Sequence, residues 1–327
     1  MRRFTTVQAI AIACLCTGAT AVVAQPAAYP ARTIRMIVGF SPGGAADITA
    51  RIVAERLSQT LGQQVVVDNR SGASGTLAAD ITVRSPADGY TISLQSTSSM
   101  SLAVPVFGAK LRYDPVKDFT LLSRMGVMPL VLVVHPSLPA RSLREFTALA
   151  RQRPREISYA SFGVGSTSHI AGEMYQIAAG VSMMHVPYKG SGQALPELMG
   201  GHVQAMFDTV IATHTFIRSG KLRALCVTTL KRSSMWPDLP TAAEAGLPAF
   251  DVSGWNGFAG PAGLPAPIAA RLSQEINAAA HHVPTRQRLL DQGMEVLAEP
   301  PEAFAAFLRQ EIAGFNKLVR EAKLTFE

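Results

Sequence analysis

Runs of apolar and β-branched residues alternate with amphipathic stretches along most of the chain. The first run, Thr33–Phe40, is followed by the glycine turn Ser41–Gly44 and by a helical pattern from 46 to 61. Strand, glycine turn and helix in this order are typical of an α/β unit. The same order continues with expected strands at 64–68 and 90–95 and an expected helix at 76–84. This alternation predicts a mostly parallel sheet with helices on both faces.

A second series of alternating elements begins after Arg124. Its expected strands are 130–134, 157–160, 183–186, 205–207 and 222–227, and its expected helices are 142–151, 166–179, 193–199 and 213–217. The last part of the chain differs, because a single strand is followed only by helices. These elements are expected at 251–259, 266–280, 284–292 and 301–322. Three helices are too few for a third domain, so we expect them to pack on the first series.

Two α/β series in a chain of 327 residues are sufficient for two domains with full hydrophobic cores. We expect a discontinuous first lobe, residues 25–124 plus 255–327, and an inserted second lobe, residues 125–254. Two crossing segments would join these lobes, since no obvious flexible linker separates them. Hydrophobic residues make up 48% and charged residues 16% of the sequence, which favours a globular α/β protein over a disordered one.

The first 24 residues have the pattern of a secretory signal. Arg2 and Arg3 precede an almost uncharged apolar stretch, and Val22–Ala24 offers a cleavage site before Gln25. A short buried or amphipathic helix is the alternative interpretation. We expect residues 1–24 to be a signal peptide and the mature protein to reside in the periplasm. No second long apolar run follows in the sequence, so a membrane anchor is not expected.

Charge and cysteine content argue against other classes of protein. The formal charge of +7 comes from scattered lysines and arginines, and no basic stripe with interleaved aromatic residues accompanies them. Nucleic acid is therefore not an expected partner. Cys226 is the one cysteine outside the first 24 residues, so the mature chain has no internal disulfide. Its apolar neighbours predict a buried, inert side chain.

The glycine turn after the first strand is a candidate ligand site. In open α/β sheets, ligands bind at the carboxyl ends of the strands. Gly43 and Gly44 allow backbone amides to point outward, and the helix that follows adds the positive end of its dipole, so an anion is favoured. Asp47 falls in the first helical turn. A tight turn without a ligand accounts for the spacing equally well.

A second turn of the same kind follows the expected strand at 157–160. Gly163 and Gly165 precede Ser166–Ser168, whose hydroxyls can cap a helix, donate to a ligand oxygen, or do both. His169 falls in the first helical turn, where it makes either a structural hydrogen bond or a ligand contact. One such turn in each lobe suggests that an anion is held between the lobes.

Common catalytic and metal-binding motifs are absent from the sequence. It contains no phosphate-binding Gly-Lys-Ser/Thr ending, no Gly-x-Ser-x-Gly, no His-Glu-x-x-His and no paired cysteines for zinc. We therefore expect no enzyme activity, no cofactor and no metal. A hydrolase built from Ser166 and His169 is the alternative, and it would require an acid and an oxyanion donor that the sequence does not identify.

An ordered set of short motifs resembles the Bug-type receptors of tripartite tricarboxylate transporters. The matching segments are Ile34–Asp47, Val67–Gly75, Asp88–Tyr90, Tyr159–His169, Val186–Gly190, Pro240–Gly246, Trp255–Gly257 and Pro261–Gly263. The resemblance implies a type II periplasmic-binding-protein fold of Venus-flytrap form, with two α/β lobes and a cleft between them. It also implies a solute-binding protein that delivers a small carboxylate to integral membrane transporter subunits.

The resemblance further implies which residues bind the ligand. They are Phe40, Ser41, Pro42, Gly43, Gly44 and Asp47 from the first lobe, and Ser161, Gly163, Gly165, Ser166, Thr167 and His169 from the second. Ser96, Thr97 and Asp208 are added because they follow strands. Tyr188 adds a side wall, although Pro187 beside it equally suits a structural turn. Trp255 either lines the cleft or packs near the crossing segments.

The resemblance does not select one ligand. Similar receptors bind dicarboxylates, tricarboxylates, amino acids or aromatic acids. Ala45 and Ala46 are small and apolar where hydroxyl residues would add contacts, which argues against a strongly polar distal group. We expect a monomer. The alternatives are a sensory partner that presents its ligand to a membrane kinase, and a hydrolase or decarboxylase on a similar two-lobed scaffold.

Overall fold

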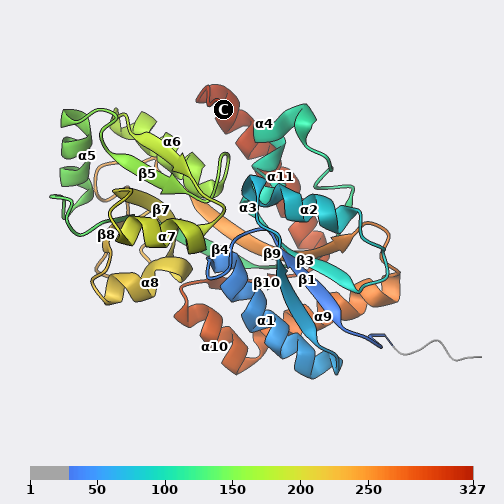
Figure 1. The fold of residues 1–327 in the computed structure, drawn as a ribbon. Coiled ribbons are helices and arrows are strands. Elements are labelled where there is room, and N and C mark those ends of the chain that lie inside the picture. Colours follow the sequence, from blue (N-terminus) through green and yellow to red (C-terminus); the bar gives the residue numbers. More distant parts are fainter. Residues whose placement is uncertain (1–28, 327) are drawn as a thin grey trace, which may run out of the picture.

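The computed structural model describes residues 29–326 and has two α/β lobes (Figure 1). Its strands follow the order β2-β1-β3-β9-β4-β7-β5-β6, and β8 and β10 also pair with β4. The expected signal peptide, residues 1–24, lies outside the described residues. Within residues 29–326, no helix combines the length and the apolar character that a membrane crossing requires.

The first lobe contains a sheet with helices on both faces. Its strands are β1 (Ile34–Val38), β2 (Val65–Asn69), β3 (Thr91–Ser96) and β10 (Glu295–Glu299), together with parts of β4 (Phe119–Val134) and β9 (Ser253–Pro261). Its helices are α1 (Ala45–Leu61), α2 (Thr76–Val83), α3 (Thr97–Met100), α4 (Ala103–Phe107), α9 (Ala266–His281), α10 (Val283–Asp291) and α11 (Pro301–Glu321), with 3-10 turns at Ala73–Gly75 and Gly108–Lys110. Helices α1, α9 and α10 share one apolar cluster, and α2 and α11 share another.

The second lobe repeats this plan on a smaller scale. Its strands are β5 (Ser158–Ser161), β6 (Met184–Pro187), β7 (Ala205–Thr209) and β8 (Arg223–Val227), and its helices are α5 (Leu143–Gln152), α6 (Thr167–Ala179), α7 (Ser191–Met199) and α8 (Val210–Arg218). Phe146, Tyr159, Tyr175 and Phe207 fill the core on the side of α5 and α6. The expected N-cap Ser142 does cap α5, because its hydroxyl accepts the N–H of Glu145.

Strand β4 takes part in both sheets. It pairs with β9 as far as Pro129 and with β7 from Leu130 onward. Pro129 has no N–H to donate, which suits a position where a strand changes its pairing partner. We therefore propose β4 and the segment that leads into β9 as the two crossings between lobes 25–124 plus 255–327 and 125–254.

The expectation of a mostly parallel sheet is wrong. Parallel pairs are confined to β2-β1-β3 in the first lobe and to β7-β5-β6 in the second. Strands β4 and β9 are antiparallel to each other, because they run between the lobes in opposite directions, and each is also antiparallel to its other neighbour, β7 or β3. Strand β10 and the first half of β4 were not expected from the sequence, whereas most other elements lie within a few residues of their predicted positions.

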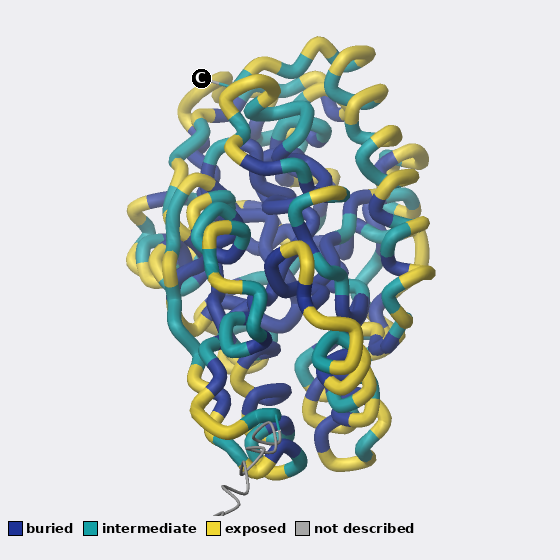
Figure 2. Tube along the Cα trace, turned by 90° about the vertical axis from the view of Figure 1, so that its right-hand side faces the viewer, coloured by how far each residue is buried: buried dark blue, intermediate teal, exposed yellow. Residues whose placement is uncertain are grey.

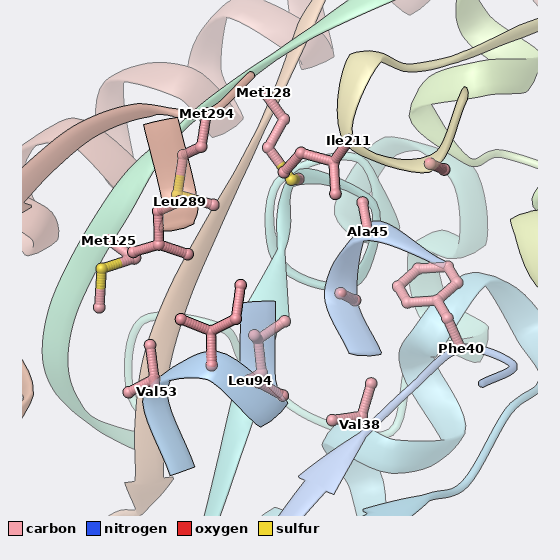
Figure 3. Packing of buried hydrophobic residues seen from close by; sticks show 14 of the residues in the cluster. Val38, Phe40, Ala45, Val53, Leu94, Met125, Met128, Ile211, Leu289 and Met294 are labelled. Atoms are coloured by element: carbon pink, nitrogen blue, oxygen red, sulfur yellow. The ribbon is translucent and has the colours of Figure 1, made fainter. Parts of the chain in front are cut away.

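The apolar core continues from one lobe to the other. One cluster joins Val38, Val53 and Leu94 of the first lobe to Met206 and Ile211 of the second, and Figure 3 shows part of it. Figure 2 shows that buried segments occupy the centre of the molecule and exposed segments its periphery. Cys226 makes no disulfide within residues 29–326 and is buried, as its apolar neighbours in the sequence suggest.

The glycine at position 126 in β4 provides a test of this packing. A Cβ atom there would lie 2.4 Å from the carbonyl oxygen of Glu295, so Gly126→Ala should lower the free energy of unfolding by about 1–3 kcal/mol. Chemical denaturation measures this change. The control is Gly314→Ala in α11, where a Cβ meets nothing within 4 Å and stability should rise by up to about 1 kcal/mol. Wild-type stability of Gly126→Ala would contradict the close packing of β4 and β10.

Candidate ligand site between the lobes

A cavity of about 40 Å³ lies where the two lobes meet. In this closed arrangement it has room for a few water molecules. Its wall consists of Phe40, Gly44, Ala45, Ala46, Ser96, Thr97, Ser98, Met128, Leu130, Phe162, Thr167, Ser191, Thr209, Gly254, Trp255 and Asn256. None of these described wall residues carries a charged side chain, so any charge in the cavity must be balanced by the backbone and by hydroxyl groups.

Five helices begin at the wall of this cavity. Their contributions are Ala45 and Ala46 from α1, Thr97 from α3, Thr167 from α6, Ser191 from α7 and the N-cap Thr209 from α8. The first N–H groups of a helix have no acceptor within it, and the helix dipole makes this end positive. Helix α1 has 17 residues and no side-chain cap at Gly44. The cavity is therefore suited to an anion.

Apolar side chains complete the cavity. Phe40, Ala45 and Met128 are three of these, and Figure 3 labels all of them. The ring of Phe40 packs edge to face on Phe162 of the second lobe, with 6.4 Å between ring centroids. Trp255 lines the cavity and also packs on the first lobe, where its indole N–H donates to Glu311. Apolar walls exclude water and so strengthen hydrogen bonds inside the cavity.

Direct contacts hold the lobes closed around the cavity. On one side, Ser98 Oγ accepts the N–H of Thr167 at 3.1 Å and lies 3.1 Å from the Thr167 hydroxyl. On another, the hydroxyl of Ser74 donates to the carbonyl of Val164 at 2.6 Å. These bonds join the turns of the first lobe to the start of α6, which is the arrangement that a ligand between the lobes would stabilise.

The structure places five predicted site residues in the cavity wall: Phe40, Gly44, Ser96, Thr97 and Thr167. The others lie outside the wall: Ser41, Pro42, Gly43, Asp47, Ser161, Gly163, Gly165, Ser166, His169, Tyr188 and Asp208. Both glycine turns thus contribute to the wall of the same cavity, although most of their residues are not part of this wall. Ligand contact by the residues outside the wall stays a prediction.

The structure corrects part of the expectation that glycine amides point outward to a ligand, because three of these amides bond within their own turns. The N–H of Gly43 donates to Asp47 Oδ2 at 2.9 Å, that of Gly163 to Ser161 Oγ at 3.1 Å, and that of Gly165 to His169 Nδ1 at 3.0 Å. In each case a polar side chain two or four residues away reaches back to its own turn. The start of α1, which has no such cap, is the better anion donor.

Asp47 stabilises the first turn. Besides Gly43, its carboxylate accepts hydrogen bonds from Arg51 and Asn69 at 2.9 and 3.0 Å. Burial alone would raise the pKa of Asp47, but the hydrogen bonds from Arg51, Gly43 and Asn69 hold that pKa below its usual value. The carboxylate is therefore ionised and paired, and its role in the structure is to shape the turn.

His169 and His185 support the second turn from behind. Their rings stack with 3.8 Å between centroids, and His185 Nε2 lies 2.6 Å from Ser161 Oγ. Burial lowers the pKa of each histidine to about 4, so both are neutral near pH 7. Ser166 Oγ accepts the backbone N–H of His169, while the His169 ring accepts from Gly165. The Ser166–imidazole pair that a hydrolase would require is not formed.

Asp208 is a carboxyl group buried directly behind the cavity wall. Its Oδ1 accepts from the Ser191 hydroxyl at 2.9 Å and from the Thr209 N–H at 2.6 Å. Its Oδ2 has no hydrogen-bond partner within residues 29–326. Burial raises the pKa of Asp208 to about 7. Because Ser191 and Thr209 both line the cavity, Asp208 orients two of its polar groups.

Sequence reasoning missed several wall residues: Ser98, Met128, Leu130, Phe162, Ser191, Thr209, Gly254 and Asn256. Thr209 ends a strand, so the rule that selected Ser96 and Asp208 would also have selected it. Asn256 is a polar residue within the otherwise largely apolar strand β9, which is a usable signal. Met128 and Leu130 had no such signal, because their place in the wall depends on the path of β4 between the lobes.

Comparisons with known proteins agree with this geometry. A family model described as "Tripartite tricarboxylate transporter family receptor" matches residues 49–324. Protein BugT of Bordetella pertussis is 39% identical over 307 residues, which cover 93% of this chain and 94% of BugT. The solved structure of the periplasmic binding protein BugD is 34% identical, with a TM-score of 0.88, over 91% of this chain and 99% of BugD.

A further solved structure, R. palustris Rpa4515 with adipate, is also 34% identical, with a TM-score of 0.86 over 91% of this chain and 99% of Rpa4515. The two-lobed fold and the cavity between the lobes define a periplasmic binding protein. The chain belongs to the receptor family of tripartite tricarboxylate transporters and is a solute receptor. The fold and family expected from the sequence motifs are confirmed.

The pKa of Asp208 predicts a pH dependence of stability. A carboxyl whose pKa is raised from 3.8 to about 7 on folding stabilises the protein below pH 4, and this contribution is lost as pH rises to 7. His169 and His185, whose pKa values are lowered, act in the opposite direction between pH 6.5 and 4. The difference between the wild type and Asp208→Asn therefore isolates the carboxyl.

We expect the difference in free energy of unfolding, Asp208→Asn minus wild type, to increase by about 1.4 kcal/mol for each pH unit between pH 4 and 7. Urea titrations at several pH values measure this difference. The amide keeps an oxygen for Ser191 and Thr209, so the variant should fold. A difference that does not change with pH would contradict the raised pKa of Asp208.

Gly192 lies at a point where the two lobes are in close contact. A Cβ atom on this residue of α7 would lie 1.9 Å from the carbonyl oxygen of Pro42 in the opposite lobe. Gly192→Ala should therefore hold the lobes apart, and, with both proteins saturated by a carboxylate that stabilises the wild type, small-angle scattering should show a larger radius of gyration for the variant. Alanine itself favours the helix, so the melting temperature should not fall. Gly314→Ala again serves as the control, and a wild-type scattering profile for Gly192→Ala would rule out the contact.

Proposed function

We propose that this receptor is exported to the periplasm, binds a small carboxylate between its lobes and delivers it to integral membrane subunits of a tripartite tricarboxylate-type transporter. The observation that carries this proposal is the convergence of five helix N-termini on a cavity whose described wall has no charged side chain. The adipate bound to Rpa4515 supports a carboxylate as the ligand. We further propose that the receptor acts as a monomer and has no catalytic activity.

The donors at the cavity are sufficient for useful affinity. A hydrogen bond to a charged group contributes about 1.5–3 kcal/mol, and micromolar binding requires about 8 kcal/mol. The uncapped start of α1 supplies backbone N–H groups, and the hydroxyls of Thr97, which accepts the N–H of Trp255, and of Thr167 stand around the same space. Roughly half a dozen such bonds therefore reach micromolar affinity after ordering costs, without an arginine or lysine.

Closure couples binding to delivery. A ligand that touches α1 on one lobe and α6 or α7 on the other interacts most strongly with the closed form, so it shifts the protein toward that form. The transporter then distinguishes a loaded receptor from an empty one by the relative position of the lobes. The contact between Ser98 and Thr167 forms when the lobes close and is lost when they open.

Ala46 provides the test of an anion site. Ala46→Asp places a carboxylate at the start of α1, where it would take the position of the ligand, so carboxylate affinity should fall at least tenfold. Ala46→Ser is the control, because it adds one oxygen without charge. Isothermal titration follows a thermal-shift screen of carboxylic acids, in which a ligand at a hundred times its Kd adds about 2.7 kcal/mol of stability. A screen without any stabilising acid, or unchanged affinity in Ala46→Asp, would count against the proposal.

A further inference from the structure

Asn256 is a buried amide whose hydrogen bonds are not made within the described part of the chain. Its side chain is 0% exposed, and neither Nδ2 nor Oδ1 has a partner. Native proteins rarely leave a buried donor or acceptor unpaired, because the group has lost its water without gaining a partner. Asn256 belongs to the cavity wall, so a ligand in the cavity is the natural partner of this amide.

The neighbours of Asn256 in the sheet explain why its amide is unpaired. Strand β9 lies between β3 and β4, and Asn256 stands opposite Ser96 on one side and Gly126 on the other. Gly126 has no side chain, and the hydroxyl of Ser96 caps α3 by accepting from Ser99. Since side chains alternate along a strand, Asn256 and the core residue Phe258 face the side of α1, away from Trp255 and its partner Phe304.

We propose that Asn256 selects the second polar group of the ligand, and that it favours an uncharged group that both donates and accepts hydrogen bonds, such as a carboxamide or a hydroxyl, over a second carboxylate. This inference rests on the proposed function, in which the start of α1 holds the first carboxylate. A primary amide offers two N–H donors and one acceptor. A carboxamide or hydroxyl satisfies both kinds of atom in Asn256.

A second carboxylate fits poorly beside Asn256. It would accept from Nδ2 but face Oδ1, which would repel it and remain unpaired. Met128 and Leu130 line the same cavity and cannot solvate a charge. A site built to pair with a polar group rejects a ligand that leaves the site unpaired.

Matched ligand pairs test the inference. The pairs are succinate, glutarate and adipate, each with its own monoamide, and isothermal titration gives the affinity of each for the wild type and for Asn256→Leu. We expect the wild type to bind at least one monoamide at least tenfold more tightly than the matched diacid. Asn256→Leu, which keeps a similar shape, should weaken that monoamide at least tenfold and remove most of the preference.

The stability of the unliganded variant separates recognition from a structural role. Removal of an unpaired amide costs little, so Asn256→Leu should melt at or above the wild-type temperature. A clearly lower melting temperature would indicate a structural amide and overturn the inference. Preference for the diacid, or equal weakening of both ligands by Asn256→Leu, would also overturn it while leaving carboxylate binding intact. If no member of any pair binds the wild type while another carboxylic acid from the thermal-shift screen does, the inference fails and the proposed function stands.

Discussion

A cavity without charged side chains holds an anion only if the backbone supplies the positive potential, and this requirement explains much of the molecule. Each strand-to-helix turn that reaches the cavity must deliver a helix start to the same point. The sheets align these turns, because strands that end at one edge release their helices at that edge. Asp47, His169 and Asp208 stabilise these turns, since each accepts hydrogen bonds from neighbouring backbone or hydroxyl groups.

Apolar packing makes closure of the lobes inexpensive. The largest hydrophobic cluster contains residues of both lobes, and the Phe40 and Phe162 rings meet across the gap. Few charged groups must lose water when the lobes close, so the polar contacts at Ser74 and Ser98 need contribute only modestly. The carboxylate of the ligand is then the main polar group that must be transferred from water into the cavity.

The sequence was sufficient for the fold class, most helices and the two turns, because strand, glycine and helix cap are local patterns. It predicted Phe40, Gly44 and Thr167, which line the cavity. It did not predict the antiparallel course of β4 and β9, since strand direction between lobes depends on pairing distant in sequence. Met128 and Asn256 were missed for the same reason: their place in the wall follows from where β4 and β9 lie side by side.

The shared strand β4 limits how the receptor opens. Strand β4 is one continuous backbone with hydrogen-bonded neighbours on both sides of Pro129. It resists bending more than a flexible loop would, because a rotation must be spread over several peptide planes. Any opening of the lobes must therefore bend β4 near the point where it changes partner, and the ladder pairs on either side of that point oppose the bend.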